Sequence, residues 1–190
     1  NNLGKISEVR GFSGDKARLV SLLSACNCIG RLSCGFLSDV ALKRCGVARP
    51  TVLALTCGLM ALSMLLLLLP GYVPLVASVA VGGFAFGGEM ALVPPIASEA
   101  FGLQLLSQAY PFLPLGLVAG SFAIATLLTS AVYNASTAGD SGSWLLQEPF
   151  RLTGLVCTVI SFLSAAVSMI LSRRLRGEYA RLRMLHSTEN

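Results

Sequence analysis

Positive charge is missing from the middle of this sequence. There is no lysine or arginine between Arg49 and Arg151, and charged residues make up only 12% of the chain. A soluble domain usually carries about 25% charged residues. This shortage argues against a water-soluble fold, and the high apolar content argues against intrinsic disorder. The mean hydropathy of +0.74 instead favours an α-helical membrane protein that crosses the bilayer several times.

Catalytic and metal-binding motifs are also missing. The sequence contains no Walker A, HExxH or GxSxG motif, and its six cysteines form no CxxC pair. Cys26 and Cys28 stand without the further ligands that a zinc site needs. We therefore expect no enzyme activity, no metal and no cofactor. We also expect no nucleic-acid partner, because the net charge of +5 comes mostly from the C-terminal tail, where it reports orientation and lipid contact.

Five apolar segments are each long enough to cross a bilayer, which takes about 20 helical residues. They cover residues 17–37, 50–69, 74–98, 108–132 and 151–171. A tight hairpin rich in proline and glycine separates the second and third segments, and a polar loop separates the fourth and fifth. The predicted fold is therefore all-α, a polytopic membrane helical bundle. Residues 1–16 then form an extracytosolic segment, and residues 172–190 form a basic tail.

Basic residues predict which loops face the cytosol. The loop between the first two spans and the tail after the last span are both basic, and an odd number of spans places them on one side, which we expect to be cytosolic. Two features disagree with this orientation. The basic segment before the first span falls outside, and the inner loop between the third and fourth spans offers only Glu99. Asn134 begins an Asn-x-Ser triplet in the outer loop and is a candidate glycosylation site. Whether the membrane is the plasma membrane or an endolysosomal or vacuolar one stays open.

Glu89 is the most informative single residue. It lies about fifteen residues into the third span, deep in the hydrocarbon region. A carboxylate at this depth costs a few kcal/mol and has to face the bundle interior or water. Two interpretations stay open. Glu89 binds the solute or carries a coupling proton, or it is a structural carboxyl held by hydrogen bonds to neighbouring helices.

Small residues and prolines set the third and fourth spans apart. Gly83 and Gly87 form one GxxxG pair and Gly116 and Gly120 form another, and such pairs let helix backbones approach closely. Four prolines are expected to remove backbone donors and kink these helices: Pro94, Pro95, Pro111 and Pro114. The pattern indicates either tight packing alone or bent helices that line a pathway and rock it open and shut.

The first span ends in a string of small and charged residues. Its members are Gly30, Arg31, Gly35, Ser38 and Asp39. Charges at a helix end can pair with charges on a neighbouring helix end and hold one conformation shut. We therefore predict a cytosolic gating motif here, with ordinary snorkelling and positive-inside charge as the alternative.

This string, Gly30-Arg31-x-x-x-Gly35-x-x-Ser38-Asp39, resembles the loop motif of the major facilitator superfamily. Further strings are similar to its nodulin-like branch, which is close to monocarboxylate-transporter-like proteins: Asn1–Ile6, Ser98–Leu103, Tyr110 and Ala119–Ser121. The resemblance implies that the five spans are the eighth to twelfth helices of a twelve-helix carrier. It also implies the cytosolic gating role for Arg31 and Asp39, whereas a carboxylate at Glu89 departs from the branch.

Taken together, these observations predict part of a secondary transporter. It would move a small solute across a lipid bilayer by alternating access, with proton coupling as an option. The chain begins without methionine, so we expect a missing N-terminal transporter half that supplies the rest of the cavity. Two alternatives stay open: a non-transporting binding or regulatory membrane protein (a pseudo-carrier) that acts with a partner chain, and an intramembrane enzyme.

Overall fold

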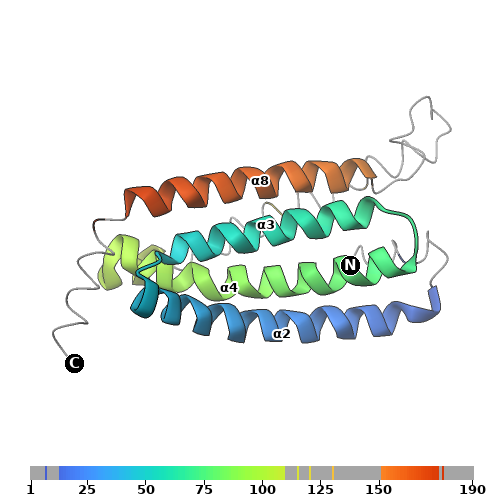
Figure 1. The fold of residues 1–190 in the computed structure, drawn as a ribbon, viewed down its shortest axis with the longest axis horizontal. Helices are drawn as coiled ribbons and strands as arrows, with labels where there is room; N and C mark the ends of the chain where they lie inside the picture. The colour runs from blue at the N-terminus through green and yellow to red at the C-terminus, as the bar shows by residue number, and fades with distance from the viewer. Residues whose placement is uncertain are drawn as a thin grey trace.

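The described part of the protein is all-α. The structure, a computed structural model, describes residues 7, 13–109, 115, 120, 130, 151–175 and 177. Four long helices lie side by side in the spatial order α2, α4, α3 and α8 (Figure 1). Each is long and apolar enough to cross a membrane. They coincide with four of the five predicted spans, and the remaining span, 108–132, lies outside the described residues apart from isolated positions.

The first long helix, α2, covers Lys16–Val40 and follows a short 3-10 turn, η1, at Ser13–Asp15. Its end widens into a π-helical turn, η2, at Ala41–Cys45. Gly46 stops this turn with a φ of 65°, a left-handed backbone that is unfavourable for residues with a Cβ atom. The chain can therefore reverse within a few residues and start the next helix beside α2.

The next two helices are joined by a short connection. Helix α3 covers Arg49–Leu68 and carries Pro50 in its first turn, where a missing N–H removes no helical hydrogen bond. Helix α4 covers Tyr72–Ala109, so it begins inside the predicted hairpin and places Pro74 in its own first turn. The connection is thus shorter than the sequence suggested, because a proline there is compatible with helix.

A break in α4 lies near its C-terminal end. Pro94 and Pro95, which we expected to kink the helix, lie inside α4 without non-helical backbone angles. The non-helical residue is Gly102, whose φ of 76° and ψ of 160° suit only glycine. Proline is compatible with a helical φ, so the helix continues through Pro94 and Pro95 although each removes a backbone donor. The backbone leaves the helical conformation at Gly102. Helix α8 then covers Arg151–Arg174.

Glycines bring α2 and α4 into direct backbone contact. A Cβ atom on Gly30 of α2 would overlap the carbonyl oxygen of Phe84, and one on Gly87 of α4 would overlap the carbonyl oxygen of Asn27. Gly83 faces the same helix one turn away. Close approach of backbones increases van der Waals contact where lipid weakens any hydrophobic drive between helices.

Hydroxyl groups link the other helix pairs. The Ser63 hydroxyl of α3 donates to the Ser78 carbonyl of α4 at 2.9 Å. The hydroxyls of Thr51 in α3 and Ser172 in α8 lie 2.7 Å apart. The latter contact places the start of α3 and the end of α8 at one end of the bundle (Figure 1). The basic loop before α3 and the basic segment after α8 therefore lie at the same end of the bundle, as the predicted order of spans requires.

Large apolar side chains remain uncovered on the outer faces of the described bundle. On α2 and α8 they include Leu32, Phe36, Leu37, Val159, Phe162, Leu163 and Val167. Exposed basic residues gather instead at the end where α2 and α8 finish, and they are Lys43, Arg44, Arg173 and Arg174. Apolar flanks with a basic end are the surface pattern of a helical bundle that meets hydrocarbon and headgroups.

The glycine contact generates a test of the packing. We expect Gly87→Ala to lower the stability of the complete protein by about 1–3 kcal/mol, because the new methyl group forces α2 and α4 apart. Gly58→Ala on α3 is the matched control, since a Cβ there meets open space. Thermal unfolding of both variants in detergent measures the difference, and equal midpoints would contradict the close approach.

Candidate functional site

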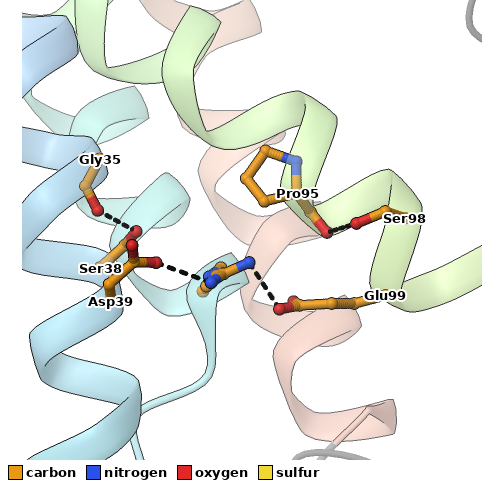
Figure 2. A network of polar contacts seen from close by, with 7 residues as sticks. Gly35, Ser38, Asp39, Pro95, Ser98 and Glu99 are labelled. Carbon is orange, nitrogen blue, oxygen red and sulfur yellow. Dashed lines mark hydrogen bonds and ion pairs between the residues drawn. The ribbon is translucent and has the colours of Figure 1, made fainter.

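One arginine joins the ends of three helices. The Nη2 atom of Arg49 lies 2.7 Å from Asp39 Oδ1, and its Nη1 atom lies 2.6 Å from Glu99 Oε1. Figure 2 shows the two carboxylates on either side of the guanidinium group. Asp39 belongs to α2, Arg49 begins α3, and Glu99 belongs to α4. We call these three residues the Arg49 cluster.

Chain direction explains why the cluster forms. Helices α2 and α4 both finish at the end of the bundle where α3 begins, so a residue late in α2 or α4 meets one early in α3. The planar guanidinium offers several donors in a fixed arrangement and can therefore serve two carboxylates at once. Arg49 and Glu99 have 17% and 16% of their side chains exposed, whereas Asp39 has 56%. The partly buried pair is therefore Arg49 with Glu99, and Asp39 is the accessible member.

Sequence reasoning did not find this cluster. It treated Arg49 as a loop charge that sets orientation and Glu99 as an isolated acid in an inner loop. In the structure Glu99 lies within α4, which continues past the predicted end of the third span. The available signal was positional: Asp39, Arg49 and Glu99 each stand at a span end that the predicted topology places on the same side.

Arg31 does not join Asp39. Its Nε atom donates to Asn27 Oδ1 on its own helix at 2.9 Å, and its side chain is exposed. Its backbone nitrogen lies 3.0 Å from the position that a Cβ on Gly87 would occupy, so Arg31 stands level with the middle of α4. Asp39 lies eight residues further on, about 12 Å along the helix. The structure therefore separates the two charges that the sequence placed together.

The small residues of the same string have local structural roles. Gly30 forms the backbone contact with α4 described above. The hydroxyl of Ser38 is buried and donates to the carbonyl of Gly35 at 2.8 Å, and Ser98 makes the same bond to Pro95 on α4 (Figure 2). A Cβ on Gly35 would meet open space. Gly30 therefore has a packing role and Ser38 a local hydrogen-bonding role, whereas no side-chain packing explains Gly35.

Glu89 is half-buried, on the part of α4 that faces α3. Gly82, seven residues or about two helical turns earlier on the same helix, faces Ser63 of α3. Glu89 stands 17 residues after Tyr72 and ten before Glu99, which correspond to about 25 Å and 15 Å of helix. The carboxyl therefore lies near the middle of α4, as its position in the sequence predicted.

The remaining predicted residues are not all described. Gly116 and Asn134 lie outside the described residues, and Gly120 is described only as an isolated, exposed position with open space around it. Across residues 13–109 and 151–175, no three metal-ligating side chains gather where they can hold an ion. The candidate site thus consists of the Arg49 cluster at one end and the Glu89 carboxyl at central depth.

The Arg49 cluster generates a stability test with an internal comparison. We expect Arg49→Gln to destabilise the complete protein by about 3 kcal/mol, because two facing carboxylates lose their shared cation. Asp39→Asn removes the exposed pair and should cost less than about 1 kcal/mol. Chemical or thermal unfolding in detergent measures both. Equal losses of stability in the two variants would contradict this expectation, because the partly buried pair would then contribute no more than the exposed pair.

Comparison with known proteins corrects the family expected from the sequence. Residues 1–181 match the family described as NFD4, C-terminal domain, and not a family of the major facilitator superfamily. The assignment to its nodulin-like, monocarboxylate-transporter-like branch was wrong, because it rested on a few short strings of residues, whereas the family match covers residues 1–181. No curated protein and no solved structure matches the chain. Because the match covers nearly its whole length, the chain belongs to the NFD4 C-terminal domain family.

Proposed function

We propose that this chain is part of a secondary transporter that moves a small solute across a membrane by alternating access. The observation that carries the proposal is Glu89, a carboxyl at central depth in a helix that is otherwise apolar enough to cross a membrane. Ionisable residues at such a depth are costly and are typical of solute and proton pathways. Glu89 is the group that we propose to bind the solute or the coupling ion.

The charge distribution supports this role for Glu89. The chain has no lysine or arginine from residue 50 to residue 150, so it offers no cation within the α3 and α4 spans to neutralise the carboxyl. Among the described residues Glu89 takes part in none of the ion pairs, which join Arg18 with Asp15 and Arg49 with Asp39 and Glu99. A purely structural carboxyl would usually be paired with a cation or saturated with donors when buried. Neutralisation by something transported is consistent with this environment.

The Arg49 cluster supports a part in the movement. It ties α2, α3 and α4 together at one end, and the glycine contacts tie α2 to α4 along their length. We propose that these three helices move as one rigid unit during alternating access. Asp39 is more than half exposed, so it is the member able to exchange partners with another part of the complete protein and hold the pathway shut on that side.

Membrane crossing and orientation are part of the same proposal. We propose that the four described helices span the bilayer and that the end with the Arg49 cluster faces the cytosol. The basic residues at that end, Lys43, Arg44, Arg173 and Arg174, support this orientation. The solute, the lipid bilayer and a further transporter portion that completes the pathway are the proposed partners.

Uptake into vesicles that contain the complete protein tests the proposal. The screen covers monocarboxylates, amino acids and metal chelates, each with and without a pH gradient. We expect one class to be taken up with a rate that depends on the gradient. Glu89→Gln should abolish the pH dependence, because the amide keeps the shape of the side chain but binds no proton.

Gly58→Ala is the control for this assay, since its new methyl group meets open space on α3. It should transport as the unchanged protein does. Absence of flux from folded, complete protein for every solute class would favour the non-transporting membrane protein instead. A gradient-dependent flux that Glu89→Gln leaves unaltered would remove the proposed role of Glu89.

A further inference from the structure

We propose that Arg31 binds a carboxylate group of the transported solute on the outer face of α2. The inference rests on the proposed transport function and deepens it, because it names the substrate class and a residue that recognises it. It also gives Arg31 a role of its own, apart from Asp39, from which the helix separates it.

Arg31 lies in the middle of a helix that is able to cross a bilayer. The candidate span runs from Lys16 to Cys45, so Arg31 stands fifteen residues after its start and fourteen before its end. Each distance corresponds to about 21 Å of helix, whereas half of the hydrocarbon core is about 15 Å thick. A guanidinium group at this depth is costly in contact with lipid, so it needs water or an anion beside it.

The outer surface of α2 carries two different rows of exposed residues, each with a spacing of three or four positions that keeps its members on one face. One row offers hydroxyl, thiol and guanidinium groups. Its members are Ser21, Ser24, Cys28 and Arg31, and we call them the polar stripe. The other row is apolar and suits hydrocarbon. Its members are Ala25, Ile29, Leu32 and Phe36. The polar stripe therefore faces an aqueous space, while the apolar row beside it faces lipid.

Asn27 fixes the direction of the guanidinium group. Its Oδ1 atom accepts the bond from Arg31 Nε at 2.9 Å, one turn earlier on the same helix. Within residues 13–109 and 151–175 this is the contact of the guanidinium, and its two Nη groups have no partner there. The Nη groups thus present the pair of parallel donors that a carboxylate accepts at both of its oxygens.

Small residues leave room beside Arg31 on the same side of α2. Ser24 and Cys28 of the polar stripe have short side chains, and a Cβ on Gly35, one turn after Arg31, would meet open space. The other side of the helix is closed, because Gly30 is in backbone contact with α4. A small ligand therefore has space to reach the guanidinium from the polar stripe.

The acids of the described bundle are not available to Arg31. Three of them form ion pairs with other arginines, and they are Asp15, Asp39 and Glu99. The fourth, Glu89, lies on the part of α4 that faces α3, so α4 stands between it and Arg31 (Figure 1). Lipid phosphates lie outside the hydrocarbon core and do not reach this depth. A carboxylate carried by the solute supplies the missing anion.

The thiol of Cys28, three residues before Arg31 on the polar stripe, tests this without transport. The complete protein in phosphatidylcholine vesicles is treated with an anionic and a cationic methanethiosulfonate reagent, and modification of Cys28 is followed by peptide mass spectrometry. We expect both reagents to react. Arg31→Gln should lower the ratio of the anionic to the cationic rate about tenfold at low salt, because residues three apart are helix neighbours. The ratio cancels any change in the reactivity of the thiol itself.

Ligand protection tests the substrate class in the same assay. Acetate, benzoate, succinate and glutamate are compared with chloride and phosphate at equal ionic strength, and a neutral methanethiosulfonate reagent reports the occupancy of the site. We expect at least one carboxylate to slow modification of Cys28 about fivefold or more, with half-protection at millimolar or lower concentration. Arg31→Lys should weaken this protection although it keeps the charge, because an ammonium group lacks the paired donors.

Leu32→Cys is the matched control, since it lies level with Arg31 but on the apolar row. It should react slowly with both charged reagents. A Cys28 that neither charged reagent modifies would overturn the aqueous face, and a rate ratio that Arg31→Gln leaves unaltered would overturn the role of Arg31. Protection by phosphate or chloride alone, or by no ion, as expected if another part of the complete protein pairs with Arg31, would overturn the carboxylate site. Failure of solute uptake counts against transport and leaves these rates unchanged, so the two failures are distinguishable.

Discussion

The absence of any basic residue between Arg49 and Arg151 is the constraint on which the arrangement depends. Two acids lie in α4, and the described bundle has one arginine within reach of one of them. Arg49 therefore serves Glu99 together with Asp39 at one end of the bundle, where Asp39 is more than half exposed and solvent moderates the electrostatic cost. Glu89 stands ten residues before Glu99, about 15 Å of helix, and is too far along α4 to share that arginine.

The same constraint explains why small residues hold the helices together. Helices that cross a lipid bilayer have little hydrophobic drive to associate, so such a bundle depends on close packing and on hydroxyl hydrogen bonds. Gly30, Gly83 and Gly87 provide the packing between α2 and α4. Ser63 and Thr51 provide hydrogen bonds from α3 to its two neighbours. The result is a set of helices held firmly enough to keep the Arg49 cluster and the Glu89 carboxyl at fixed positions along α4.

The sequence predicted the helices well because their signal is length and hydropathy, which are local properties. It did not predict side-chain pairing, which depends on how helices rotate and on where they end. Arg31 and Asp39 are near neighbours in a short string, yet the helix carries them about 12 Å apart. Glu99 was assigned to a loop because the third span was ended too early, although α4 continues to Ala109. The family was misassigned because the resemblance rested on short strings, which are too few residues to specify a family, whereas the family match extends over residues 1–181.

The account as a whole requires the bundle to cross a bilayer with the Arg49 end in the cytosol. Cys45, exposed in the turn after α2, reports this most directly. A membrane-impermeant maleimide is applied to cells that produce the complete protein with Cys45 as its one remaining cysteine, before and after selective permeabilisation of the plasma membrane. The account predicts labelling only after permeabilisation. Labelling of intact cells, or labelling that requires detergent to dissolve internal membranes, would contradict it.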